Sequence, residues 1–286
     1  MKKFLILFLL VSPINGQEPV VPVIDIPYVP TETYRDGWEE RGEQWAKWLS
    51  PSVMVTSYNG GGGSGTICHY DGEYAYVISC GHLYPSGRRS FNDLKDNPIY
   101  KKITVFYHNE KKLDSPREYK GETLCYVQYL RNNVYDVSLL RFKPDWDNPW
   151  VVPIAPIDYK LEKNKYYHSC GCDGLTPVAH YLVRYLSEDI VGNISQIITT
   201  DNNPRGGRSG GGVMTDDGKL LFICSRGGGG YAYWTSLKQI HNFLNEEKFS
   251  FVLNNFQFAQ KLPIIDKIGP SKEYPKDFIL IPNQSR

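Results

Sequence analysis

Residues 203–213 read Asn203-Pro-Arg-Gly-Gly-Arg-Ser-Gly-Gly-Gly-Val213 and place Ser209 in a glycine-rich turn. A serine between glycines exposes its Oγ and leaves neighbouring backbone N–H groups free to point at one spot. Acyl transfer needs this combination of a nucleophile and donors aimed at the developing oxyanion. By itself the turn is weak evidence, because most glycine-rich loops that contain a serine are only loops. The interpretation therefore depends on finding a base for Ser209.

Two upstream residues are candidate partners of this serine. A serine hydroxyl is a poor nucleophile near neutral pH and needs a base, usually an imidazole that a carboxylate holds. His82 lies where the apolar run 74–79 ends and a loop begins, which favours a functional role over a core one. Asp136 opens the apolar run 137–142, where it is either a turn residue or a carboxylate that orients another group.

The region around these residues is typical of short β-strands joined by turns. Asp71-Gly72 and Thr215–Lys219 each separate two apolar runs and predict hairpins. The expected strands are 53–57, 66–70, 74–79, 103–107, 124–129 and 137–142, then 166–170, 178–185, 190–199, 212–214, 220–224 and 231–234. A stretch rich in Pro and Trp, 144–156, connects the two sets. Many short strands at this spacing predict an all-β sandwich or barrel.

Two helices are expected beside the strands. Trp38, Trp45 and Trp48 fall at near-helical spacing and predict a short helix that packs on the body. The second expected helix is 235–248, with the apolar residues 237, 240, 243 and 244 on one face and Thr235 or Ser236 as its cap.

Length and charge limit the function classes. With 286 residues, the chain can form one large domain or two small ones whose core needs no metal. Its formal net charge of +1 gives no electrostatic reason to expect nucleic acid or an anionic membrane as a partner.

The N-terminus predicts export. Lys2 and Lys3 precede the apolar run 4–11 and a polar exit at 13–16, so we expect a signal peptide cleaved after Gly16 and a secreted or periplasmic protein without a membrane anchor. In that setting the six cysteines can form up to three disulfides with pairing left open, or some are buried thiols.

Three motifs in order are similar to those of one enzyme family. Gly65-Thr66 followed by an apolar run ending in Ser79-Cys-Gly-His82, then Asp136-Val-Ser-Leu-Leu140, then Gly207-Arg-Ser-Gly-Gly211 resemble the trypsin-like serine peptidases. The order His, Asp, Ser is that family's order, and the likeness covers roughly residues 52–247. The simple bacterial, HtrA-like members without a PDZ domain are the nearest. The resemblance implies an all-β fold of two six-stranded antiparallel barrels, chymotrypsin-like, with a short N-terminal helix and a C-terminal helix.

The resemblance also implies a division of the chain. We expect a signal peptide at 1–16, an N-terminal extension with the short helix at 17–51, and a peptidase domain at 52–247. Its barrels would span about 52–145 and 150–247, followed by a C-terminal extension at 248–286. The N-terminal extension is either a removable inhibitor or a permanent part of the body, and its Trp-bearing helix favours the second.

Site residues follow from the resemblance as well. The implied triad has Ser209 as nucleophile, His82 as base and Asp136 as the group that orients the imidazole. The backbone N–H groups of Gly207 and Ser209 would form the oxyanion hole. The implied substrate-binding residues are Asn203, Ser225, Arg226 and Gly227, and Ser225 would also support Asp136. The implied function is a secreted serine endopeptidase that acts on peptide or protein substrates without metal or cofactor.

Departures from the family pattern refine these expectations. Many members have Asp at the position of Arg208, where it pairs with a newly freed N-terminus, so we expect no activation of that kind. Arg208 and Arg205 are interpreted as solvated loop charges rather than as anchors for an acidic substrate. Gly81 stands in place of the usual Ala and is expected to loosen the turn before His82. Asn203 instead of Asp argues against a preference for Lys or Arg.

Rival interpretations remain. The fold could belong to an inactive binding protein, or the same triad could serve an esterase. Zinc binding at Cys68-His69, Cys80/His82 or His168–Cys172 is disfavoured, because adjacent strand residues point to opposite faces and no matching second pair is present. The remaining histidines are expected to be surface or packing residues: His108, His180 and His241.

Overall fold

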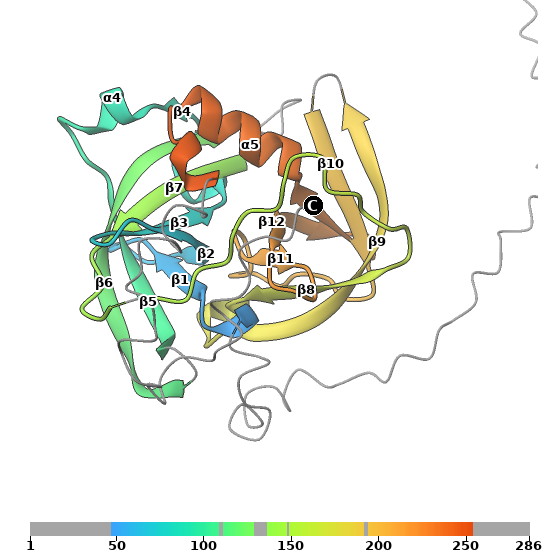
Figure 1. Cartoon of the computed structure of the whole chain (residues 1–286), viewed down its shortest axis with the longest axis horizontal. Coiled ribbons are helices and arrows are strands. Elements are labelled where there is room, and N and C mark those ends of the chain that lie inside the picture. Colours follow the sequence, from blue (N-terminus) through green and yellow to red (C-terminus); the bar gives the residue numbers. More distant parts are fainter. Residues whose placement is uncertain (1–46, 109–110, 129–135, 148, 192–193, 254–286) are drawn as a thin grey trace, which may run out of the picture.

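Two β-barrels lie side by side in the computed structural model, which describes residues 47–108, 111–128, 136–147, 149–191 and 194–253 (Figure 1). The predicted signal peptide and most of the N- and C-terminal extensions lie outside the described residues. No helix in the described part of the chain is long and apolar enough to cross a bilayer.

The first barrel is formed by the N-terminal strands. These are β1 (Ser52–Thr56), β2 (Gly62–Tyr70), β3 (Ala75–Ser79), β4 (Gly87–Arg89), β5 (Tyr100–His108), β6 (Lys111–Gln128) and β7 (Asp136–Phe142). The order β6-β5-β1-β2-β3-β7 closes because β7 also pairs with β6, and β4 adds to the outside of β6. Apolar side chains that alternate along β1, β3 and β5 fill the interior, which includes Val53, Val77 and Ile103.

The second barrel contains six strands. They are β8 (Tyr166–Gly171), β9 (Ala179–Val191), β10 (Ile194–Thr200), β11 (Gly212–Met214), β12 (Leu220–Gly228) and β13 (Tyr231–Thr235). The closed order is β10-β13-β12-β11-β8-β9, with every neighbouring pair antiparallel. Two closed antiparallel barrels confirm the predicted all-β architecture.

Helix α5 (Leu237–Glu246) follows the second barrel and packs against the first. Ser236 caps it by accepting a hydrogen bond from the Gln239 amide at 3.4 Å, and its four expected apolar residues at 237, 240, 243 and 244 are buried. Although α5 follows the second barrel, it lies beside β4 of the first, where Arg88 Nε donates to Glu247 Oε1 at 2.7 Å (Figure 1). Of the expected N-terminal helix, only its end is described, and 47–49 are helical.

Strand limits differ from the sequence expectations in several places, among them the end of β12, which continues to Gly228 instead of 224. β9 continues to Val191, although the next strand was expected to begin at residue 190. The turn between β9 and β10 therefore lies further along the chain than predicted. β2 begins inside the glycine run at Gly62. β4 and the first half of β6 were not predicted, because residues 113–120 are mostly polar and partly or fully exposed and carry no apolar alternation.

The predicted disulfides are wrong. All six cysteines are buried free thiols. Five of them serve as small apolar side chains of one hydrophobic cluster, which also contains Tyr76 and Leu139: Cys68, Cys125, Cys170, Cys172 and Cys224. Burial raises the pKa of the Cys68 thiol to about 12, which keeps it protonated.

The free thiols predict a simple titration. In denaturant without reductant, a chromogenic disulfide reagent is expected to react with all six cysteines, whereas the native protein reacts far more slowly because each sulfur is buried. A count of four, two or zero in denaturant contradicts the free-thiol structure.

The start of the described chain packs against a pair of histidines in the second barrel. His168 Nδ1 and His180 Nε2 are 2.8 Å apart, and His168 Nε2 is 2.9 Å from Asp216 Oδ1. The Trp48 ring stacks on His168 at 3.7 Å, and its Nε1 donates to the Thr215 carbonyl at 3.0 Å. The end of the N-terminal extension is therefore packed on the second barrel.

This pair predicts acid sensitivity. The pKa of His168 is lowered from 6.5 to about 4, because burial and the charge of Lys47 lower it by more than the facing Asp216 raises it. The neutral imidazole therefore stabilises the fold fully above pH 6.5, and that contribution is lost as pH falls from 6.5 towards 4. It amounts to about 3 kcal/mol. Urea unfolding at several pH values should show this slope in wild type and a smaller one in His168→Phe, and equal slopes contradict it.

Candidate active site

The loop between β10 and β11 holds Ser209 in a shape that requires glycine on both sides. Gly207 and Gly210 have φ of 93° and 86°, a left-handed conformation that residues with a Cβ rarely adopt. A Cβ on Gly207 would collide with the Cys172 carbonyl, and one on Gly210 with the Ser64 carbonyl. Each glycine is thus required by conformation and by space.

Backbone hydrogen bonds dock this loop on both barrels. The Ser64 amide of β2 donates to the Ser209 carbonyl at 2.6 Å, and the Gly210 amide donates to the Cys224 carbonyl of β12 at 2.8 Å. A Cβ on Gly210 would lie 2.9 Å from the Cys80 amide, next to the end of β3. Ser209 therefore lies where the two barrels meet.

His82 lies just beyond β3, in the short 3₁₀ turn η1 (Gly81–Leu83). The expectation that Gly81 loosens this turn is wrong. A Cβ there would collide with the Val127 carbonyl and lie 3.1 Å from the Val137 carbonyl. Gly81 thus allows the turn to pack closely against β6 and β7.

Asp136, the first residue of β7, is buried and holds the imidazole. Its Oδ2 lies 2.8 Å from His82 Nδ1, and its Oδ1 accepts from the His82 amide at 2.7 Å. Ser225 Oγ of β12 donates to Oδ2 at 2.6 Å. Three donors from two barrels therefore fix the carboxylate in its orientation towards Nδ1, which leaves Nε2 free of Asp136.

The electrostatics of His82 suit a base. Burial alone lowers its pKa, but the hydrogen bond and the charge of Asp136 raise it more, so the net pKa lies above 6.5. Its side chain remains 32% exposed, which leaves the imidazole accessible to a substrate.

Ser209 and His82 belong to segments that meet at Gly63, and no hydrogen bond joins the two residues in the described part of the chain. Gly63 of β2 shows their proximity, because a Cβ there would collide with the Ser209 carbonyl and lie 3.2 Å from Leu83 Cδ2. His82 Nε2 instead lies 3.6 Å from Cys80 Sγ. Catalytic hydrogen bonds are often long before substrate binds, so this geometry is compatible with a triad.

The backbone amides of Gly207 and Ser209 donate no hydrogen bond to any other residue in the described part of the chain. The adjacent amides of Arg208 and Gly210 do donate, to the Arg205 and Cys224 carbonyls. The two N–H groups expected to form an oxyanion hole are therefore available to a ligand.

The same residues also form a compact group of metal-ligand types. The ligand atoms of Cys80, His82 and Asp136 lie within 4.8 Å of one another. Burial raises the pKa of the Cys80 thiol well above its ordinary 9.0, and His82 Nδ1 already bonds to Asp136. A protonated thiol and an engaged imidazole nitrogen are poor ligands, so a proton-transfer pair explains the arrangement better.

The expected substrate-binding residues come from two segments: Asn203 from the loop before Ser209, and Ser225, Arg226 and Gly227 from β12. Asn203 is exposed, and Pro204 beside it packs on Gly227, where a Cβ would lie 2.9 Å from Pro204 Cγ. Arg226 is exposed, with Nη2 donating to Gln196 Oε1 at 3.3 Å. The sequence analysis did not name Pro204 among the candidate site residues, because its contact with Gly227 joins positions far apart in the chain.

The interpretation of Arg208 as a solvated charge is wrong. Its side chain is fully buried and paired with Asp173, whereas Arg205 is exposed. The sequence signal for this pair was weak, because Asp173 follows a cysteine-rich segment that shows no charge pattern.

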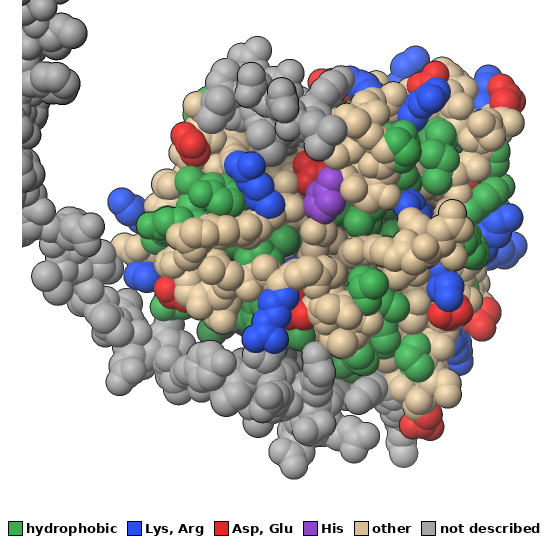
Figure 2. Space-filling view, turned by 180° about the vertical axis from the view of Figure 1, so that it is seen from behind, with side chains coloured by type: hydrophobic (Ala, Val, Ile, Leu, Met, Phe, Trp, Pro, Cys, Tyr) green, Lys and Arg blue, Asp and Glu red, His purple; other side chains and the backbone are tan. Residues whose placement is uncertain are grey.

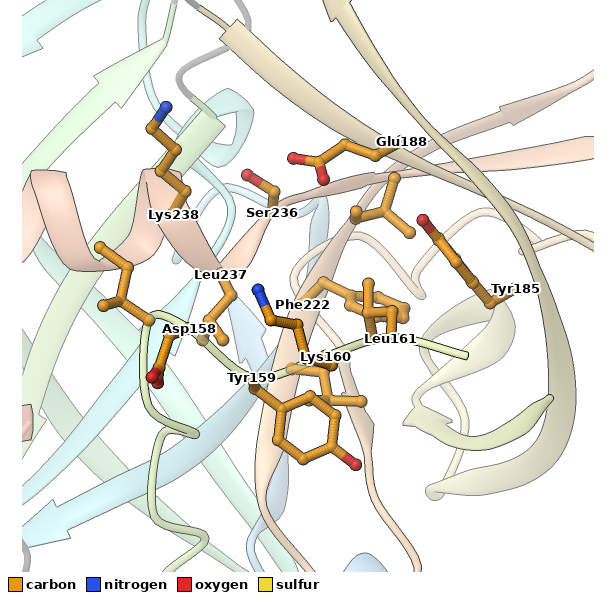
Figure 3. Close-up of a pocket in the computed structure, with 13 residues that line it drawn as sticks. Asp158, Tyr159, Lys160, Leu161, Tyr185, Glu188, Phe222, Ser236, Leu237 and Lys238 are labelled. Carbon is orange, nitrogen blue, oxygen red and sulfur yellow. The ribbon is translucent and has the colours of Figure 1, made fainter. Parts of the chain in front are cut away.

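One cavity lies away from these residues. A cavity of about 340 Å³ opens between residues 157–161 and the start of α5, with Tyr185, Glu188 and Lys238 among its lining residues (Figure 3). It shares no residue with the expected site. On the face in Figure 2, basic and acidic side chains are interspersed, as the balanced net charge implies.

Comparisons with known proteins bear on the fold. No protein-family model matches the chain, and a search of curated proteins finds no similar sequence. Among solved structures, the Rv3671c protease of M. tuberculosis H37Rv in its inactive form is similar with a TM-score of 0.50 and 15% identity, over 71% of this chain and 91% of that one. A serine endoprotease from Yersinia pestis is similar with a TM-score of 0.51 and 16% identity, over 80% of this chain and 69% of that one. The chain therefore has the double-barrel fold of trypsin-like serine proteases.

Proposed function

We propose that this chain is a serine endopeptidase that cleaves peptide bonds through an acyl-enzyme on Ser209. The observation that carries the proposal is the buried Asp136–His82 pair beside a serine loop whose two oxyanion-type amides are unoccupied by the described residues. Three donors orient the Asp136 carboxylate towards the imidazole: the His82 amide, His82 Nδ1 and Ser225 Oγ. A histidine with a purely structural role would not need this arrangement.

In the first half of the reaction, Ser209 Oγ attacks the scissile carbonyl carbon while His82 Nε2 takes the hydroxyl proton. The carbonyl oxygen becomes an oxyanion, which the amides of Gly207 and Ser209 stabilise. Asp136 keeps the neutral imidazole in the tautomer with its proton on Nδ1 and then stabilises the imidazolium that forms. The C–N bond then breaks, and His82 returns the proton to the leaving amine.

In the second half, water attacks the acyl-enzyme. His82 Nε2 removes a proton from the water as the new C–O bond forms, and the oxyanion is stabilised by the same two amides. The bond to Ser209 Oγ then breaks and Oγ recovers the proton, which releases the carboxylic acid product.

The finer assignment is also part of the proposal. The chain would be a secreted or periplasmic enzyme, similar to the simple HtrA-like bacterial proteases. The packing of Trp48 on His168 supports an N-terminal extension whose end stays with the mature body.

Pro204 predicts a preference for small side chains at P1. We assign Pro204 and Gly227 to facing walls of the pocket for the P1 side chain. Because the two residues are in contact, little space remains between the walls for a large side chain. A fluorogenic peptide library is expected to show Gly, Ala or Ser at P1. Pro204→Gly should raise kcat/KM for P1 Leu relative to P1 Ala by about 10-fold or more. A wild-type preference for Phe, Lys or Arg contradicts this prediction.

The experiment that tests the proposed function compares amide and ester substrates with the purified full chain. We expect unfolded casein to be cut into peptides, and a fluorophosphonate to stop the reaction. Ser187→Ala, a change at an exposed serine of β9, serves as the matched control and should cut normally. Hydrolysis of p-nitrophenyl esters without any peptide cleavage would identify an esterase instead, and no hydrolysis of either would identify a binding protein.

A further inference from the structure

Arg208, the residue before the nucleophile, is anchored inside the second barrel. Its Nε and Nη2 donate to the two carboxylate oxygens of Asp173 at 2.9 and 3.0 Å. Nη1 donates to Ser169 Oγ at 3.0 Å, and Nη2 also donates to the Ala179 carbonyl at 3.0 Å. The guanidinium lies 3.6 Å from the Tyr181 ring centre. Four hydrogen bonds and one aromatic ring therefore surround the cation.

The barrel is shaped to receive this side chain. Arg208 is 0% exposed, and a buried cation is costly unless it is both paired and hydrogen-bonded. Gly171 at the end of β8 makes room, because a Cβ there would lie only 3.0 Å from Arg208 Cγ. Two parallel hydrogen bonds to one carboxylate fix the orientation of a guanidinium in a way that a single contact cannot.

The backbone transmits this anchoring to the Ser209 loop. The Arg208 amide donates to the Arg205 carbonyl at 3.1 Å, and its carbonyl accepts from the Gly211 amide at 2.8 Å. The Gly206 carbonyl accepts from the Gly174 amide at 2.5 Å, next to Asp173 in the turn η2 (Asp173–Leu175). Side chain and backbone together tie the loop to η2 on the two sides of Gly207.

We infer that Arg208 is a positioning residue, which uses Asp173 as an internal anchor to hold the amides of Gly207 and Ser209 in their oxyanion-binding arrangement. The inference rests on the proposed function. Both charges of the pair belong to the folded body, within residues 169–211, so the loop is ordered without a newly cleaved N-terminus. The protein should therefore be active without proteolytic activation.

The test compares Arg208→Met and Arg208→Lys with wild type on the best fluorogenic peptide from the library. Arg208→Met should lower kcat about 10²- to 10³-fold, the loss expected when oxyanion donors are misplaced. KM and the acid limb of the pH profile should stay close to wild type, because the substrate walls and the His82–Asp136 pair are untouched. Binding of a peptide boronate, which mimics the tetrahedral intermediate, should weaken by the same factor as kcat/KM falls. Arg208→Lys should restore part of the activity and lose only about 10-fold, since an ammonium keeps the charge but not the two-point contact.

Matched controls separate positioning from stability. Arg141→Met removes an ion pair with Glu122 (2.8 Å) in the first barrel and should keep kcat. Ile240→Ala destabilises the core through the buried face of α5 and should also keep kcat in the folded fraction. A folded Arg208→Met whose kcat is within about 3-fold of the wild-type kcat would overturn the inference. If Arg208→Met does not fold, Arg208→Lys decides, and a kcat equal to wild type overturns it.

A readout independent of catalysis separates this inference from the proposed function. Hydrogen exchange of peptides spanning 203–211 should accelerate in Arg208→Met and stay unchanged in Arg141→Met. Unchanged exchange in both variants overturns the role of Arg208. A wild type that turns over no substrate, but whose loop exchange depends on Arg208, overturns the proposed enzyme and the catalytic part of the inference while leaving the anchor established.

Discussion

Replacing Ser209 by alanine is expected to lower kcat about 10⁶-fold, because no other group in the proposed mechanism can form the acyl-enzyme. A residual acceleration of about 10³-fold over water should remain, since substrate binding and the oxyanion donors are intact. The free energy of unfolding should change by less than about 0.5 kcal/mol. Ser209 Oγ has no hydrogen bond to another described residue, so its removal leaves no buried partner unsatisfied.

Kinetics and equilibrium unfolding of the same preparation check this prediction. Ser187→Ala provides the control for a serine-to-alanine change at an exposed position of the second barrel. A Ser209→Ala protein that keeps even a hundredth of the wild-type kcat, once contamination is excluded by a second purification, would contradict the assignment of the nucleophile.

Asp136→Asn is expected to lower kcat about 10⁴-fold with the fold intact. An amide has nearly the shape of the carboxylate, but it carries no negative charge to stabilise the imidazolium. It also has one acceptor oxygen for the two N–H groups of His82 that face Asp136. The amide nitrogen would favour the imidazole tautomer that carries its proton on Nε2, which is the wrong one for a base.

The pH profile gives this prediction a second readout. In wild type, the acid limb of kcat/KM should lie above pH 6.5, because burial lowers the pKa of His82 but Asp136 raises it further than burial lowers it. Without the carboxylate the limb should move to lower pH. The same pair stabilises the fold most when His82 is protonated, so its contribution is complete below pH 6.5 and is lost as pH rises through the raised pKa.

Glu122→Gln is the matched control for Asp136→Asn. Glu122 also pairs with a basic side chain in the first barrel, Arg141 at 2.8 Å, but it is 28% exposed and lies outside the proposed mechanism. It should keep both kcat and the position of the acid limb. An Asp136→Asn limb that coincides with the wild-type limb contradicts the coupling of Asp136 to His82.

The parts of the fold that sequence could predict are those where one short segment determines its own conformation. Asp71-Gly72 and Thr215–Lys219 form the expected hairpins, because their turn residues suit positive φ or side-chain capping. The apolar periodicity over 237–244 gave α5 correctly. The glycines around Ser209 pointed to a tight turn, and Gly207 and Gly210 have the positive φ values that glycine permits there.

The parts that sequence could not predict depend on partners far away in the chain. The burial of Arg208 requires Asp173 and Tyr181, which only barrel closure brings to it. The Val127 carbonyl of β6 leaves no room for a Cβ at Gly81. The turn therefore packs tightly, whereas the local sequence predicted a looser turn. The cysteines fill cores, a choice that composition cannot distinguish from disulfide bonding.

The most direct test of the central claim is the site of covalent modification by a fluorophosphonate. Intact mass and peptide mapping of the treated wild-type protein should show one phosphonyl group per chain, on Ser209, with much slower labelling in His82→Ala and none at that peptide in Ser209→Ala. An unmodified wild-type protein, or an adduct on any residue other than Ser209, would contradict the account.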